Sequence, residues 1–285
     1  MARAIRRWLP GKLLLIASLA GSPLYAAPAK KPAPAPVKHV TISADAKKKL
    51  AENLSGFKFG MTKDDVIAAL SKQLDDKYNT QISSTTDIAV QDRLRRDKKK
   101  ELADIQASYV QFDGKRTGWD VSVVEDEFVH HTDESMVVRW ENSNGKNNRR
   151  FFFFYQGKLW KMFISLDVSI LPAGQQNFDT FKNLFTSSAQ YGPGDVDVGK
   201  ILWHTDEFDV RALDKLKTYG ALGLSIEDWK MEKDVLAMRA SKAPENTGTS
   251  PIVNSMVDKD NTDHPNVKQN GDAVDAVINA NGGKK

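Results

Sequence analysis

The spacing of apolar residues changes along this chain, and that change restricts the fold more than any other feature. Between residues 56 and 112 apolar side chains recur about every four positions; the clearest run is Val66, Leu70, Leu74 and Tyr78. After Gly118 they alternate with a period of two. A period near 3.6 predicts amphipathic helices, and a period of two predicts strands. We therefore expect helices packed on an antiparallel sheet, which is an α+β fold.

The first part of the chain predicts two helical segments, Gly56–Gln81 and Ile88–Phe112. Thr62 is a favourable N-cap residue, and Asp65 follows three positions later, close to the spacing of a capping box. The period-two region predicts a meander of strands. Asn-Gly at positions 144 and 145 is a strong hairpin signal, so we expect the turn within 142–146. The predicted strands are Trp119–Val129, Met136–Glu141, Phe151–Tyr155 and Leu159–Leu166.

The second part of the chain repeats the order of helix and strands. The predicted elements are a helix at Asn177–Ala189, strands at Lys200–His204, Phe208–Leu213 and Leu222–Ile226, and a helix at Asp228–Ala240. This order suggests a loose tandem duplication of a helix-pair-plus-meander unit, with units near 56–168 and 177–229.

Both ends of the chain differ in composition from its middle. Residues 1–26 combine a basic start, the short apolar run 13–20 and small residues at Ala26 and Ala27, which is the order of a cleavable signal peptide. The alternative is a membrane anchor, but eight apolar residues span only about 12 Å as a helix, against about 30 Å of hydrocarbon. Arg6-Arg7 leaves twin-arginine export open beside the general route. We expect a Pro-rich linker at 27–39, a globular domain at 40–243 and a disordered tail at 244–285.

The net charge of +4 and the pI of about 9.0 describe the precursor. The segment 1–26 holds four basic and no acidic residues, so the chain after the signal is neutral. Cysteine is absent, which excludes a disulfide scaffold and a thiolate metal site. A neutral exported protein is not expected to bind nucleic acid.

Candidate metal ligands are densest at Glu125–Glu134, where His130 and His131 lie among carboxylates. Adjacent histidines on a strand point to opposite faces, and no HExxH pair is present. We favour a solvated turn over a metal site. His204, Asp206, Ser225 and Asp228 could supply a hydrolase triad, but a triad has no diagnostic spacing and no GxSxG motif is present.

Glycine and arginine clusters give weaker signals. Gly220–Gly223 lacks the spacing of a dinucleotide or phosphate loop. The run Asp92–Glu101 carries a local charge of +3 and could touch anionic lipid, although a solvated helix face explains it better. Arg149-Arg150 beside four phenylalanines fits the charged edge of a sheet core better than a stacking platform. We assign no catalytic, cofactor-binding or metal residue and expect no cofactor.

The segment Phe57–Leu70, which reads FKFGMTKDDVIAAL, resembles the opening of the SmpA/OmlA (BamE-like) envelope proteins. In that family a G-M-T segment caps the first of two helices that pack on a small antiparallel sheet. The resemblance implies this fold and an envelope location, and it carries over no functional residue. This chain lacks the lipidated cysteine of the family and is much longer.

The sequence therefore predicts a periplasmic or secreted, non-enzymatic protein that binds another envelope protein and keeps no stable membrane anchor after signal cleavage. The alternative is a periplasmic hydrolase or a small-ligand or metal-binding protein. A third hypothesis is association with anionic surfaces through Arg93–Lys100.

Overall fold

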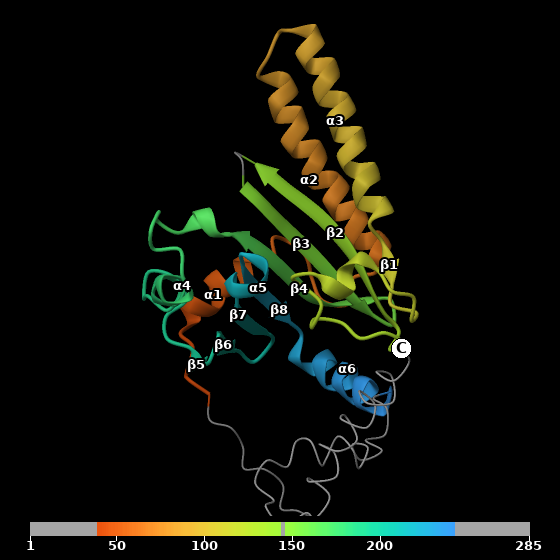
Figure 1. Ribbon diagram of the computed structural model, residues 1–285. Coiled ribbons are helices and arrows are strands. Elements are labelled where there is room, and N and C mark those ends of the chain that lie inside the picture. Colours follow the sequence, from red (N-terminus) through yellow and green to blue (C-terminus); the bar gives the residue numbers. More distant parts are fainter. Residues whose placement is uncertain (1–38, 144–145, 243–285) are drawn as a thin grey trace, which may run out of the picture. The chain divides into compact units, whose positions relative to one another are not determined.

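An eight-stranded antiparallel sheet forms the centre of the computed structural model, which describes residues 39–143 and 146–242 (Figure 1). The strand order is β1-β2-β3-β4-β8-β7-β6-β5. Two four-stranded meanders thus pair through their last strands, β4 and β8. The strands are β1 (Val110–Gln111), β2 (Glu134–Ser143), β3 (Lys146–Tyr155), β4 (Lys158–Asp167), β5 (Asp195–Asp197), β6 (Lys200–His204), β7 (Asp209–Lys215) and β8 (Ala221–Glu227).

The α+β architecture with helices on an antiparallel sheet is confirmed. The helices are α1 (Ala44–Glu52), α2 (Lys63–Ser83), α3 (Ile88–Ala107), α4 (Phe178–Phe185), α5 (Leu216–Tyr219) and α6 (Trp229–Lys242), with short 3-10 turns at Gly118–Val121 and Val168–Ile170. The paired meanders agree with the predicted repeat, but the duplication itself stays a prediction. The signal, almost all of the linker and the tail lie outside the described residues.

One face of the sheet is covered by α1, α2, α3 and α4. Val66, Leu70 and Leu74 of α2 are fully buried in a core that also contains Phe152 of β3 and Trp203 of β6. This confirms the four-residue stripe of the sequence. The N-cap is also confirmed: Thr62 and the carboxylate of Asp65 form a complete capping box. The α2–α3 hairpin extends beyond the ends of β2 and β3 (Figure 1).

The opposite face is covered over β2, β3 and β4 by the segment 118–133 and by α6. Val123, Val124 and Phe128 from the segment and Val235 from α6 are buried there. The predicted strand Trp119–Val129 is wrong, because this segment forms a 3-10 turn followed by further turns. Val123 and Val124 are both buried although they are neighbours, and a strand would have placed them on opposite faces.

Several predicted boundaries also change. The predicted helix Ile88–Phe112 ends at Ala107, and its last residues form β1. The predicted loop 142–146 is shorter, because Ser143 already pairs with Lys146. The first predicted helix begins at Lys63, after turns at 53–60, and the helix predicted from Asn177 ends at Phe185. Helices α1 and α5 and strand β5 had no counterpart in the predicted elements.

Candidate functional site: a groove beside the open edge of β2

Strand β2 has an open outer side along much of its length. Its inner side pairs with β3 at all ten residues, whereas β1 pairs only with Ser135 and Met136. The Ser108 hydroxyl then takes the place of a strand, since it accepts from the Val138 N–H at 2.9 Å and donates to the Val138 carbonyl at 3.0 Å. Beyond Val138, no strand in the described part of the chain pairs with this side.

The backbone of Trp140 faces this open side. Along an antiparallel strand, the N–H and C=O groups of successive residues point alternately to the two neighbours. On the open side, Val138 is hydrogen-bonded to Ser108, and the carbonyl of Glu134 accepts from the Phe112 N–H at 3.0 Å. Trp140 shares this orientation, and its N–H and C=O have no hydrogen-bond partner within residues 39–143 and 146–242. Its side chain is 44% exposed.

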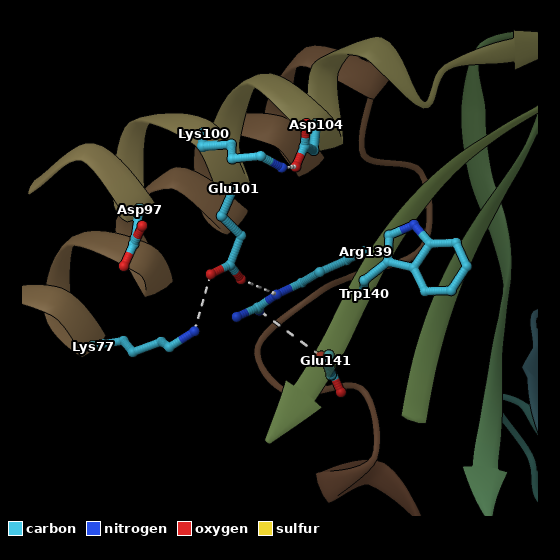
Figure 2. Close-up of a pocket in the computed structure, with 8 residues that line it drawn as sticks. All are labelled: Lys77, Asp97, Lys100, Glu101, Asp104, Arg139, Trp140 and Glu141. Atoms are coloured by element: carbon cyan, nitrogen blue, oxygen red, sulfur yellow. Dashed lines mark hydrogen bonds and ion pairs between the residues drawn. The ribbon is translucent and has the colours of Figure 1, made fainter. Parts of the chain in front are cut away.

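A groove lies between this edge and α3, and we call it the β2 groove. It consists of two cavities of about 480 and 630 Å³ that share Glu101, Asp104 and Trp140. Figure 2 shows Arg139 reaching from β2 toward α3, while Trp140 points to the other side of the strand. The first cavity is also lined by Lys77, Asp97, Lys100, Arg139 and Glu141, and the second by Ile105, Ala107, Ser108 and Trp119.

Glu101 connects the walls of the groove. Its carboxylate accepts from Lys77 Nζ at 2.9 Å and from the Tyr78 hydroxyl at 3.0 Å, and its other oxygen lies 3.7 Å from Arg139 Nε (Figure 2). Burial, together with the Glu101 carboxylate, raises the pKa of Tyr78 to about 12. Arg139 also donates to Gln73 of α2 at 2.8 Å. These contacts connect α2, α3 and β2 along one wall of the groove.

Trp140 forms the aromatic side of the groove. The guanidinium of Arg149, directly opposite on β3, lies 5.1 Å from the Trp140 ring centroid, within cation–π range. Burial lowers the pKa of Arg149, whose buried Nε has no hydrogen-bond partner among the described atoms. Trp119 packs edge-on against Phe151 at 5.5 Å between centroids. The indole of Trp140 is thus positioned by a neighbour but still accessible.

A second polar cluster lies under α6 on the face opposite to α2, and it is closed. Lys161 Nζ donates to the Glu127 carboxylate at 2.8 Å, and both side chains are almost completely buried. Arg211 forms an ion pair with Glu227, and Arg239 of α6 pairs with Glu134 at 2.6 Å. We interpret this cluster as structural, because its buried charges pair with each other and attach α6 and the segment 118–133 to the sheet.

The histidines considered as metal ligands have other partners. His130 Nε2 lies 2.6 Å from Asp120, and its Nδ1 accepts from the Gly114 N–H at 3.1 Å. The His131 ring packs against Gly114, where a Cβ would come within 2.2 Å of it. Within residues 39–143 and 146–242, no three histidine or carboxylate groups are arranged to hold a metal ion. The segment is not simply a solvated turn, because Glu127 and Glu134 are buried in ion pairs.

The four residues considered for a hydrolase triad are not brought together. His204 pairs with Asp209 at 2.6 Å, and Asp206 pairs with Lys47 at 2.6 Å. The buried Ser225 hydroxyl donates to Glu227, while Asp228 accepts from the first turn of α6. Of the glycines at 220–223, the first ends α5 in a left-handed conformation. Gly223 faces Phe163, which a Cβ would approach to 2.8 Å.

The basic run lies on the exposed length of α3. Three of its cations form ion pairs, namely Arg95 with Asp92, Lys98 with Asp75 and Lys100 with Asp104. Arg93, Arg96 and Lys99 are exposed and have no ion pair among the described residues. Arg150, unlike Arg149, lies on the face covered by α1, α2, α3 and α4, and it pairs with Glu141 at 3.2 Å.

Comparisons with family models, curated proteins and solved structures found no match to this chain. The resemblance at Phe57–Leu70 therefore stays a prediction. No helix in the described part is both long and apolar enough to cross a membrane. The alternation within the predicted strand Met136–Glu141 puts Trp140 on the same strand face as Met136 and Val138, but it does not indicate the groove. The available signal was that an aromatic residue continues an apolar stripe only two residues before the expected turn.

Proposed function

We propose that this chain is an exported, non-enzymatic protein that binds another protein of the cell envelope, and that the β2 groove is its contact surface. The observation that carries the assignment of the surface is the open edge at Trp140, where an exposed indole and unpaired backbone groups lie together in one groove. An open strand edge is a template for pairing with another chain, and aromatic residues are frequent binding anchors.

The proposal of export rests on residues 1–26, and the groove adds nothing to it. The order of charge, apolar run and small residues supports a signal peptide. Expression of the full chain in a bacterial host, followed by N-terminal sequencing of the periplasmic protein, tests this part. We expect a protein that starts at Ala27. A chain that keeps residues 1–26 and stays in the cytoplasm would contradict export.

Binding is tested by affinity purification from envelope extracts with quantitative mass spectrometry. The tagged wild-type protein should enrich the same partner in repeated experiments, and Trp140→Ser should reduce that enrichment at least tenfold. Leu236→Ser is a matched control, because Leu236 is a 52% exposed apolar residue on α6. It should bind like the wild type. Equal enrichment by Trp140→Ser, or the lack of any reproducible partner, would contradict the proposal.

A further inference from the structure

The unpaired backbone of Trp140 defines how the groove can bind, if the proposed function is correct. We propose that the β2 groove takes one extended peptide segment of the partner, which adds to the sheet as a strand beside β2. Strand addition uses main-chain hydrogen bonds for affinity and the alternating side chains for specificity. The inference rests on the proposed function and adds the type of partner: an extended segment with basic side chains at alternate positions.

The open edge of β2 is long enough for a short strand. From Arg139 to Ser143, β2 continues for five residues with β3 on one side, a length of about 16 Å. Helix α3 runs along the other side and supplies Glu101 and Asp104 to the groove. The same edge of a second copy would bring its own α3 toward this one, because α3 residues line the groove. An extended segment has no such obstacle.

Charge selects the side chains of this segment. The wall on the α2 side has four carboxylates and three cations, and Asp97 has no ion pair among the described residues. On the other side of the strand, Trp119 and Trp140 lie with Glu101 and Asp104, and Arg149 of β3 already lies 5.1 Å from the Trp140 ring. Because Glu101 and Asp104 already pair with Lys77, Arg139 and Lys100, the excess of carboxylates in the lining, with the unpaired Asp97, is what favours an Arg or Lys side chain, through charge complementarity. The linker at 27–39 fits poorly, because its four prolines lack the N–H that pairing needs.

Peptide selection provides the probe for the test. A display library of random 12-residue peptides is selected on the full chain, and each recovered peptide is measured on Trp140→Thr. We expect peptides rich in Arg or Lys at alternate positions, which Trp140→Thr binds at least tenfold more weakly. Failure to recover any peptide that this variant weakens would contradict both the inference and the assigned surface.

N-methylation then distinguishes strand addition from side-chain binding. Each amide of the best peptide is methylated in turn, which removes one hydrogen-bond donor at a time. Strand addition predicts at least tenfold weaker binding at every second position and nearly unchanged binding at the positions between. A flat profile, combined with weak binding to Trp140→Thr, would overturn strand addition but leave the groove as a protein-binding surface.

A matched pair of variants tests the same hydrogen bond on the protein. Trp140→Pro and Trp140→Thr both lack the indole, but only the proline lacks the N–H. That N–H faces away from β3, so proline leaves the β2–β3 pairing intact. We expect Trp140→Pro to bind at least tenfold more weakly than Trp140→Thr, with a similar melting temperature. Equal binding would overturn the inference. If the proline variant does not fold, the methylation profile decides alone. A wild-type dimer that Trp140→Pro dissociates would instead assign this edge to a second copy.

Discussion

Replacing Lys161 with methionine is expected to destabilise the protein strongly, because it leaves the Glu127 carboxylate buried without its nearest cation. The Lys161 side chain is 1% exposed and that of Glu127 is 4% exposed, with 2.8 Å between the charged atoms. At an effective dielectric constant of about 20, this separation gives an attraction of about 6 kcal/mol. Desolvation offsets part of it, and removal of one partner of a buried pair costs about 3–5 kcal/mol. Arg211, 3.5 Å away, remains and compensates in part, which keeps the expected loss within this range.

Urea unfolding at pH 7 measures this effect. Lys161→Met should lower the free energy of unfolding by about 4 kcal/mol, and adding Glu127→Gln should recover at least half of the loss, because no unpaired charge remains. Lys182→Met is the control, since Lys182 pairs at 2.7 Å with Asp179, whose side chain is 80% exposed, and its cost should stay below about 1 kcal/mol. A loss below 1 kcal/mol for Lys161→Met would refute the description of this pair as a buried ion pair.

The same pair predicts a pH dependence. Burial raises the pKa of Glu127, but the charges of Lys161 and Arg211 outweigh burial and lower it to about 2. Ionised Glu127 therefore stabilises the wild type above its ordinary pKa of 4.5, and this contribution is lost as the pH falls toward 2. In Lys161→Met the lost cation raises the pKa of Glu127. The difference in unfolding free energy between the wild type and Lys161→Met should then shrink on acidification from pH 7 to 5. A constant difference would contradict the reasoning.

Three further predictions concern single sites. Burial raises the pKa of Glu232 from 4.5 to about 7. The folded protein thus retains a proton there that the unfolded chain loses, and the unfolding free energy should fall by about 1 kcal/mol as the pH rises from 4.5 to 7, after allowance for partial solvent screening. Urea titrations of Glu232→Gln should lack this slope, and an unchanged slope would exclude Glu232 as its source. Thr62→Ala removes the cap of α2 and should cost about 1 kcal/mol in thermal unfolding, whereas Thr62→Ser should cost much less. Gly114→Ala should lower the melting temperature, because Gly114 has φ of +103° and the added Cβ would meet the His131 ring; Gly118→Ala, in open space without positive φ, is the control.

The sequence by itself determined the elements whose stability is local. The four-residue stripe from Val66 to Tyr78 and the cap at Thr62 predicted α2, because each signal involves residues within one or two turns. Alternation predicted most of the strands for the same reason, and their order along the chain predicted an α+β fold. The same reasoning failed at Trp119–Val129, where Val123 and Val124 pack together against the sheet and tertiary burial outweighs the local pattern.

Only the tertiary structure decided where the candidate site lies. The pairing of β4 with β8, the closed ion pairs under α6 and the position of α3 beside β2 join residues far apart in the chain, and no local spacing encodes them. In the sequence, Trp140 is one more apolar residue of a strand. Only the structure shows that β1 is too short to reach it, which leaves its backbone unpaired on that side. Whether a hydrogen-bonding group is satisfied depends on which neighbour reaches it in space, and for this edge that neighbour is absent among the described residues.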